Sequence, residues 1–304
     1  MTIQFTDNNK HLDFCPLTLT RPVCDLRFGI LTIQETWRAL FEAAGKSVHC
    51  FYQTESYLQE KYSNAEQVDL TIAGNYKPTA VTVNALLALQ EGASLFVNGK
   101  WLATKGVDAG LSVDLDDHAA IWVEYIWDLF QQNAAAIQID LDVLTSHRTS
   151  ESISSTNQVI KPENVFIEPG AKVECATLNA STGPIYIGKD AEVMEGALIR
   201  GPFALGDHAT VKMGAKIYGP TTIGPECKVG GEISNSILHG YSNKGHDGFI
   251  GNSLIGEWCN LGADTNSSNL KNNYGLIKLY HYRSATLEQT PLQFCGLIMG
   301  DHSK

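Results

Sequence analysis

The stretch IGKDAEVMEGALIRGPFALGDHATVKMGAKIYGPTTIGPECKV, residues 187–229, decides the fold of the second half of this chain. An aliphatic residue returns at every sixth position in it: Ile187, Val193, Ile199, Leu205, Val211, Ile217, Ile223 and Val229. A helix has about 3.6 residues per turn and a half-buried strand alternates with period two, so neither explains this repeat. The repeat therefore predicts a β-helix of stacked short strands and disfavours a β-sandwich.

The repeat extends outward from this stretch. A first coil is expected over residues 165–173. After Val229 the interval of six fails, and it returns at Phe249, Ile255 and Leu261. We therefore expect residues 235–248 to form a loop that projects from a corner of a coil. Residues 266–290, rich in Asn and Tyr, form a second interruption.

Residues 299–301, Met-Gly-Asp, have the pattern of a new coil, and the chain stops at Lys304. A β-helix that ends in the middle of a coil exposes an apolar cross-section. The sequence therefore predicts that the second domain is truncated at its C-terminal end, or that a neighbouring chain covers that end.

Composition excludes several classes of protein. With 304 residues, of which 43% are hydrophobic, the chain can bury a sizeable core in one or two domains. A formal net charge of -11 argues against a general nucleic-acid binder. The 7 cysteines contain no CxxC pair, which is typical of reduced thiols in the cytoplasm. No apolar run is long enough to span a membrane and no secretory signal is evident, so a soluble cytoplasmic protein is expected.

The first part of the chain follows another pattern, in which strands and helices alternate as in an α/β domain. Thr32 and Glu35 are spaced as a capping box, and Asn98-Gly99 predicts a hairpin. Strands are expected at residues 3–5, 47–52 and 68–73, and helices at residues 32–44, 82–89 and 121–130. The polar stretch 146–157 predicts a linker, which gives domains at residues 1–145 and 158–304.

The second half contains one candidate for acid–base chemistry. Histidine is the residue type most used for acid–base chemistry, and His246 lies between Gly245 and Gly248, which allow close approach of a substrate. Lys244, two residues away, could neutralise a phosphate group. The alternative is an ordinary surface histidine without a role.

The segment KGHDGFIG, residues 244–251, followed by IGEWCNLGADT, residues 255–265, resembles a known family. It is similar to the acetyltransferase domain of bifunctional N-acetylglucosamine-1-phosphate uridyltransferase / glucosamine-1-phosphate acetyltransferase. The resemblance implies a left-handed parallel β-helix that forms a homotrimer, with active sites between subunits and acetyl-CoA as co-substrate.

This resemblance also implies roles for single residues. His246 would be the base that takes a proton from the sugar amine, and Asn260 matches a substrate-binding Asn. Lys244 lies one residue from the position of the family's Lys, and Phe249 replaces a Tyr that contributes a phosphate-binding hydroxyl. A later Lys of the family has two candidates here, Lys271 and Lys278.

The N-terminal half has a second resemblance. Thr20-Arg21-Pro22 is similar to the end of the Gly-x-Gly-Thr-Arg loop of sugar-1-phosphate nucleotidylyltransferases, although Leu17-Thr-Leu19 replaces the glycines. The longer pattern from Leu17 to Ile30 resembles a divergent branch of that family, which joins a Rossmann-like domain to a hexapeptide-repeat β-helix.

The second resemblance implies UTP and Mg²⁺ as co-substrate and cofactor. Arg21 would be catalytic, and Thr20, Asp25 and Arg27 would bind substrate. The alternative is a structural ion-pair cluster of Arg21, Asp25 and Arg27. The metal ligands stay unknown, because the family's metal-binding Asp has no clear match among four candidates: Asp108, Asp114, Asp116 and Asp117.

Three functions are therefore compatible with the sequence. In the first, the β-helix acetylates glucosamine-1-phosphate and the α/β domain joins the product to UTP. In the second, only nucleotidyl transfer takes place, and the β-helix is an oligomerisation or effector-binding module. In the third, the chain is a binding protein without catalytic activity. All three involve small-molecule sugar phosphates and nucleotides, with no nucleic acid and no membrane.

Overall fold

The computed structural model describes residues 1–304 and divides into two compact units. Residues 1–26 and 31–126 form the first unit, and residues 27–30 and 127–304 form the second. The division therefore lies before the predicted linker, because the helices that precede the linker belong to the second unit. No helix has the length and apolar character needed to cross a membrane.

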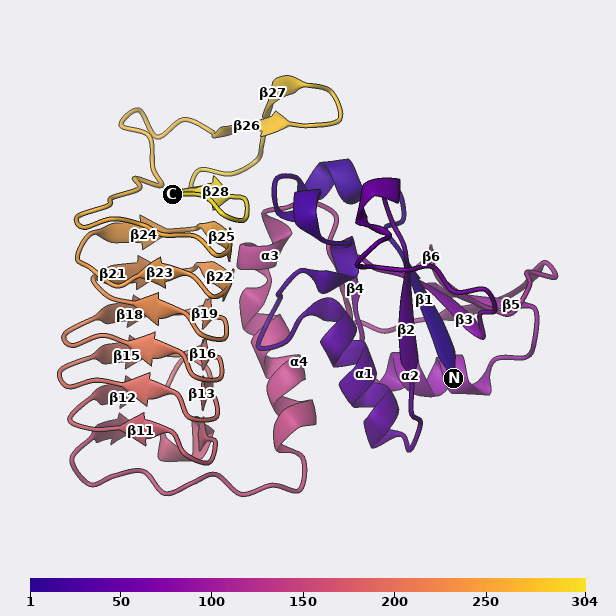
Figure 1. Cartoon of the computed structure of the whole chain (residues 1–304). Coiled ribbons are helices and arrows are strands. Elements are labelled where there is room, and N and C mark those ends of the chain that lie inside the picture. Colours follow the sequence, from indigo (N-terminus) through magenta and orange to yellow (C-terminus); the bar gives the residue numbers. More distant parts are fainter. The chain divides into compact units, whose positions relative to one another are not determined.

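The first unit contains a mixed sheet with the strand order β2-β1-β3-β6-β5-β7 (Figure 1). β1 is parallel to both β2 and β3, whereas β6 is antiparallel to β3 and to β5. The strands are β1 (Thr2–Thr6), β2 (His49–Gln53), β3 (Leu70–Ala73), β5 (Ala93–Val97), β6 (Lys100–Lys105) and β7 (Leu111–Leu115). The predicted strands and the hairpin at Asn98-Gly99 are present, so the mixed α/β character of this unit is confirmed.

The helices of the first unit begin at side-chain caps. α1 (Ile33–Ala43) starts after Thr32, and the Thr32 and Glu35 side chains form the predicted capping box. α2 (Ala80–Ala88) starts after Thr79, whose hydroxyl accepts from the Thr82 amide. Short 3-10 turns connect the remaining elements: η1 (His11–Phe14), η2 (Leu17–Thr20), η3 (Val23–Asp25) and η4 (Ser56–Leu58).

The predicted helix at residues 121–130 is wrong. Residues Ile121–Trp122 instead form strand β8, which pairs with β4 (Tyr76–Lys77). The ring of Trp122 contacts that of Tyr76 edge-on at 4.8 Å between centroids, so pairing and aromatic packing outweigh local helix preference. Helix formation begins only at α3 (Asp128–Gln131) and continues in α4 (Asn133–Thr145), which was not predicted.

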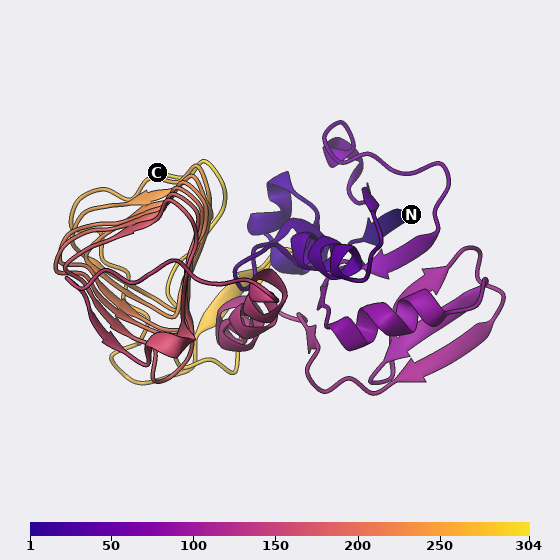
Figure 2. The ribbon, with the colours of Figure 1, turned by 90° about the horizontal axis from the view of Figure 1, so that it is seen from below.

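The second unit is a β-helix with three parallel sheets, and its coils superpose when viewed along their axis (Figure 2). The first sheet contains β10 (Val165–Ile167), β13 (Ile185–Ile187), β16 (Phe203–Leu205), β19 (Thr221–Ile223), β22 (Ile237–Gly240), β25 (Leu254–Glu257) and β28 (Ile298–Met299). The second contains β11 (Lys172–Val173), β14 (Glu192–Val193), β17 (Thr210–Val211), β20 (Lys228–Val229) and β23 (Asn243–Lys244). The third contains β9 (Gln158–Ile160), β12 (Thr177–Asn179), β15 (Leu198–Arg200), β18 (Lys216–Tyr218), β21 (Glu232–Ser234) and β24 (Phe249–Gly251).

The aliphatic residues of the repeat point inward and form the core of the β-helix. Ile187 pairs with Leu205 and Leu205 with Ile223, so a regular coil has 18 residues. The residues of the quoted stretch are at most 2% exposed at these inward positions. The predicted hexad repeat and its stacked parallel strands are therefore confirmed.

The expected loop at residues 235–248 is wrong, because this segment forms strands within a coil. Ile223 pairs with Leu238 and Val229 with Lys244, so this coil has 15 residues where a regular coil has 18. Only Gly230 and Gly231 separate β20 from β21. The period fails because corners of this coil are shortened, mainly the one at Gly230 and Gly231, whereas the sequence predicts an inserted loop.

The second predicted interruption is confirmed. Residues 266–290 contain a hairpin of β26 (Lys278–His281) and β27 (Thr286–Gln289), whereas near their start Ser267 still pairs with Ile250 of β24. The chain then returns to β28, which pairs with β25 through Leu254↔Ile298 and Ile255↔Met299. The predicted new coil at Met299 therefore begins where expected.

Residues Arg27–Ile30 lie against α4 and the first sheet of the β-helix, although they come from the N-terminal part of the chain. The amide of Gly29 donates to Asn133 Oδ1 at 3.0 Å, and the amide of Ile30 donates to Asp140 Oδ2 at 2.8 Å. Asn133 Nδ2 in turn donates to Thr222 Oγ1 at 3.0 Å. Gly29 has a φ of +91°, and a Cβ there would lie 2.6 Å from the Ala136 carbonyl oxygen, so only glycine fits.

Candidate functional site

The first candidate site lies where β1 and β3 end in the first unit. The chain passes from β1 through α1 to β2 on one side, whereas β3 lies on the other side of β1. In parallel sheets, ligands bind at the carboxyl ends of strands where the chain changes direction in this way. The loop after β1 begins at Asp7, and the loop after β3 begins at Gly74.

Polar residues from these two loops meet at the edge of the sheet. Asn8 Nδ2 donates to Asn75 Oδ1 at 3.3 Å, which ties the two loops together. A Cβ at Gly74 would lie 2.9 Å from the Thr6 carbonyl oxygen and 3.2 Å from the Cys24 amide. The absence of a side chain at Gly74 thus lets the segment before α1 pack closely over this edge.

A buried carboxylate and imidazole lie at the same edge. Asp7 Oδ1 accepts from the Val23 amide at 2.8 Å, and Asp7 Oδ2 lies 3.1 Å from His11 Nδ1. His11 Nε2 lies 3.1 Å from the hydroxyl of Tyr57. A proton on Nδ1, donated to Asp7, would leave Nε2 free to accept from Tyr57. Burial raises the pKa of Tyr57, so its hydroxyl stays protonated near neutral pH.

Three predicted site residues come together just before α1. Arg21 is 4% exposed and lies near Asp25. Burial raises the pKa of the Asp25 carboxyl. The hydroxyl of Tyr62 at 2.7 Å, the charge of Arg21 and the amide of Gln34 at 2.5 Å lower this pKa, but their effect is smaller than that of burial. Thr20 is exposed next to them.

Arg27 belongs to the second unit, whereas Arg21 and Asp25 belong to the first. It is 8% exposed, its Nε donates to the His239 carbonyl at 2.7 Å, and its Nη1 donates to the Ile30 carbonyl at 2.6 Å. These contacts join residues 27–30 to β22.

The structure assigns no ligands to Mg²⁺. No group of three His, Cys, Asp or Glu side chains is placed to hold a metal ion. Asp117 is buried and accepts from the hydroxyls of Thr79 and Thr82, next to the start of α2. The other three candidates from the sequence, Asp108, Asp114 and Asp116, are exposed. We derive no step through a metal ion from this arrangement.

Lys244 of the second unit points into the β-helix and not to the surface. It takes the inward position of β23 that Val229 takes in β20, and it is fully buried. Its Nζ donates to the carbonyls of His246 at 2.6 Å, Asp247 at 3.1 Å and Gly230 at 3.4 Å. Burial lowers the pKa of this amine. The structure thus places the amine among backbone carbonyls, where we had expected it to meet a phosphate group.

The other candidates of the second unit lie on or near its surface. His246 is exposed in the corner that follows β23, and Phe249 is half-buried at the start of β24. Asn260 is exposed in the next coil, where its Oδ1 accepts from Asn243 Nδ2 at 3.0 Å. Lys271 and Lys278 are exposed and lie in the interruption at residues 266–290.

The residues at the ends of β1 and β3 belong to no motif in the sequence. Asp7, Asn8 and Asn75 lie within two residues of the end of β1 or β3, and His11 begins the 3-10 turn that follows β1. The rule that ligands bind at the carboxyl ends of parallel strands could have pointed to them.

Comparison with known proteins indicates that the chain is a transferase. Residues 3–149 match the family model described as sugar nucleotidyl transferase, and this match covers the sheet with its edge residues. No curated protein sequence matches the chain.

Two similar solved structures are variants of a perosamine acetyltransferase from Caulobacter crescentus. A histidine-to-alanine variant of GDP-perosamine N-acetyl transferase, in complex with CoA and GDP-perosamine, is 10% identical with a TM-score of 0.17 and covers 88% of this chain and 90% of that chain. A histidine-to-asparagine variant, also in complex with CoA and GDP-perosamine, is 10% identical with a TM-score of 0.17 and covers 89% of this chain and 92% of that chain. We draw no argument about fold or function from similarities of this size.

Proposed function

We propose that the first unit transfers a nucleotidyl group from a nucleoside triphosphate to a sugar 1-phosphate. The observation that supports this most is the cluster of polar residues at the ends of β1 and β3, within a region that matches a sugar nucleotidyl transferase family. A Rossmann-like classification of this unit is part of the proposal. UTP and N-acetylglucosamine-1-phosphate are the substrates that the sequence resemblance favours.

In this reaction an oxygen of the sugar phosphate attacks the α-phosphorus of the triphosphate, and the bond to pyrophosphate breaks. The attacking oxygen is already ionised, so catalysis consists mainly of positioning and of stabilising negative charge. Arg21 carries a permanent positive charge for this purpose. Asn8 and Asn75 can orient polar groups of a nucleotide at the sheet edge. Any Mg²⁺ would arrive with the triphosphate, and no protein step is assigned to it.

The test measures pyrophosphate release by the full chain with N-acetylglucosamine-1-phosphate and each of the four nucleoside triphosphates. Arg21→Ala should lower the rate at least about 100-fold, because a charge contact to the reacting phosphates is removed. Arg200→Ala, an exposed arginine of β15, is the matched control and should leave the rate unchanged. Absence of pyrophosphate release by the unaltered chain with all four nucleotides would contradict the proposal.

Arg21 is buried, so its replacement could weaken folding as well as activity. Arg21→Lys and a comparison of melting temperatures separate the two effects. A variant that melts like the unaltered chain and still loses activity supports a role in the reaction. If both Arg21 variants keep full activity, Arg21 is structural.

Acetyl transfer by the second unit is a second candidate. The observation that favours it is the exposure of His246 and Asn260 in neighbouring coils. His246 would take a proton from the amine of glucosamine-1-phosphate, the amine nitrogen would attack the thioester carbonyl of acetyl-CoA, and the CoA thiol would leave. A left-handed β-helix and assembly into a homotrimer belong to the same proposal, since the resembling family completes its sites between subunits.

Release of free thiol from acetyl-CoA tests this candidate. His246→Ala should abolish it and leave pyrophosphate release intact. His208→Ala, at an exposed corner of a regular coil, is the control. Thiol release that His246→Ala does not change argues against this role. Activity in the first assay alone favours a β-helix that serves for oligomerisation or effector binding, and activity in neither assay favours a binding protein.

A further inference from the structure

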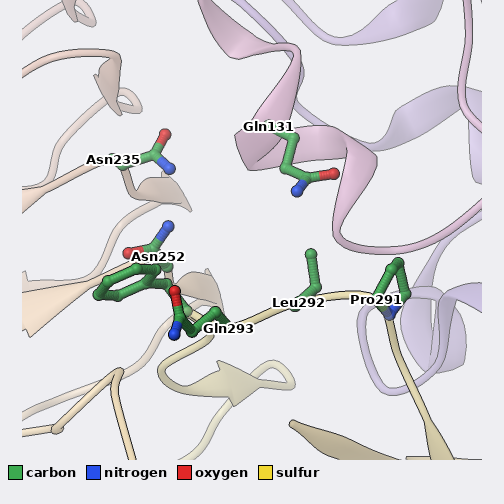
Figure 3. Close-up of a pocket in the computed structure, with 7 residues that line it drawn as sticks. Gln131, Asn235, Asn252, Pro291, Leu292 and Gln293 are labelled. Carbon is green, nitrogen blue, oxygen red and sulfur yellow. The ribbon is translucent and has the colours of Figure 1, made fainter. Parts of the chain in front are cut away.

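The second unit contains a cavity apart from His246 and from the residues that the sequence singles out. Its volume is about 490 Å³, and it is lined by Gln131, Asn235, Asn252, Pro291, Leu292, Gln293 and Phe294 (Figure 3). Gln131 comes from α3, the two asparagines come from corners of the β-helix, and the other residues come from the segment that returns to β28. All of these elements belong to the second unit.

The two asparagines of the cavity belong to a stack at one corner of the coils. Asn235 and Asn252 both have left-handed backbones, with φ of +45° and +49°, which asparagine tolerates better than most residues. Asn269 Nδ2 donates to Asn252 Oδ1 at 2.7 Å. This bond fixes the orientation of the Asn252 amide, and its nitrogen, which points toward Asn235 in Figure 3, is a donor on the other side.

Gln293 supplies a hydrogen-bond acceptor. Its Nε2 donates to the Tyr274 carbonyl at 3.1 Å, and its Oε1 can accept from a ligand. The cavity thus offers a donor from Asn252 and an acceptor from Gln293. A hydroxyl group both donates and accepts, and several hydroxyls on one ring can serve several amides at once.

The remaining lining narrows the class of ligand. None of the lining residues carries a charge, so nothing there would balance a phosphate or an ammonium group. Leu292, Pro291 and Phe294 provide apolar surface, and only Phe294 has an aromatic ring. A planar nucleobase binds best between two flat apolar surfaces. The C–H face of a sugar ring needs only one apolar surface, with amides around it.

We propose that this cavity binds a neutral carbohydrate ring. Amides of Gln131, Asn235, Asn252 and Gln293 bond its hydroxyls, and the apolar residues contact its C–H face. None of its lining residues is one to which either proposed reaction is assigned. The inference therefore goes beyond both proposed reactions.

Saturation-transfer NMR and calorimetry on the full chain test this inference, with glucose, N-acetylglucosamine, uridine and inorganic phosphate as probes. We expect binding of at least one of the two sugars with a dissociation constant in the millimolar range, as for a small ligand held by a few neutral hydrogen bonds. Asn252→Gly suits the positive φ and removes the amide, and Gln131→Leu removes a second amide. Each should weaken sugar binding about fivefold, since a hydrogen bond contributes about 1 kcal/mol and about 1.4 kcal/mol corresponds to a factor of ten.

Gln138→Leu is the matched control for Gln131→Leu, because Gln138 is exposed on α4 and its amide bonds Asp142 outside the cavity. It should leave sugar binding unchanged. The inference is overturned if neither sugar binds, if only uridine or only phosphate binds, or if Gln138→Leu weakens binding as much as Gln131→Leu. Pyrophosphate and thiol release, measured on the same variants, show separately whether the proposed reactions hold.

Discussion

Val229 and Lys244 occupy the same inward position in successive coils of the second unit, but one is aliphatic and the other is a cation. Both are fully buried. The residues at the same inward position in the earlier strands of this sheet are all aliphatic: Val173, Val193 and Val211. The comparison between these regular coils and the short coil shows what a β-helix core needs in order to accept a charge.

The difference lies in the corners. In a regular coil the Lys212 carbonyl, just after Val211, accepts from the Ala215 amide, so the corner satisfies itself. In the corner after Lys244, the carbonyls of His246 and Asp247 accept from the lysine Nζ. The short corner at Gly230 and Gly231 lies next to this longer one in the stack. A buried cation is tolerated because these carbonyls replace the water that it loses.

The largest effect is expected when a lysine is placed in a regular coil. Val211→Lys should lower the free energy of unfolding of the second unit by about 4 kcal/mol or more, because the charge is buried at an ordinary corner. Val211→Met has a side chain of similar length without the charge and serves as the control. Urea denaturation followed by circular dichroism measures the difference, and equal losses in the two variants would show that only volume matters.

A smaller effect is expected from closing the space of the short corner. Gly231 has a φ of +71°, and a Cβ there would lie 2.6 Å from the Gly248 carbonyl oxygen. Gly231→Ala should therefore cost about 2 kcal/mol, from backbone strain together with the close contact. Gly214→Ala has nearly the same φ, +69°, with no atom within 4 Å of the new Cβ, so it should cost only about 1 kcal/mol. Equal melting temperatures of the two variants would mean that the short corner can relax.

Removal of the buried amine should have a moderate effect that depends on pH. Lys244→Met leaves three carbonyls without their donor but also removes a buried charge, so a net loss of about 1 kcal/mol is expected at pH 7. Burial lowers the pKa of Lys244 below its ordinary value of 10.5. Between the folded and unfolded pKa values the unfolded chain binds more protons, so this residue makes stability rise with pH up to about 10.5.

The methionine variant lacks this rise, and its deficit should therefore grow as the pH increases from 7 toward 10. Melting curves of both proteins across this range test the sign. Parallel curves would show that the amine titrates as it does in water.

The smallest effect is expected one residue before Val229, where Lys228 points outward and is exposed. Lys228→Met should change the free energy of unfolding by less than about 0.5 kcal/mol, because a solvated side chain loses little. This variant sharpens the comparison, since it removes a lysine from the same sheet without touching the core. A loss as large as that of Lys244→Met would show that position in the strand does not decide the effect.

The regular coils could be predicted from the sequence because one inward residue per side is under the same constraint in every coil. The short coil could not, because a missing stretch and an inserted stretch both interrupt a period. For the same reason, the sequence predicts that Lys244 could meet a phosphate group. Its burial depends on the register of β23 against β20, and no local pattern contains that register.

In the first unit, local features could likewise be predicted from the sequence, and contacts between distant residues could not. The capping box of Thr32 and Glu35 acts within one turn and could be predicted. The pairing of Ile121–Trp122 with β4 joins residues about 45 positions apart and overrides local preference. The candidate site at Asp7, Asn8 and Asn75 likewise depends on which strands are neighbours in the sheet. The Thr-Arg-Pro motif does not contain this information.

The segment Arg27–Ile30 has a consequence for whether the two units can exist apart. The β-helix unit is not one continuous piece of chain, because it includes these four residues from before α1. A fragment of residues 127–304 would leave Asn133 and Asp140 without the backbone amides that they bond, and the His239 carbonyl without Arg27. Each buried polar group left without its partner costs about 1–3 kcal/mol. A β-helix unit cut from the chain at a single junction would therefore lose part of its own hydrogen bonding.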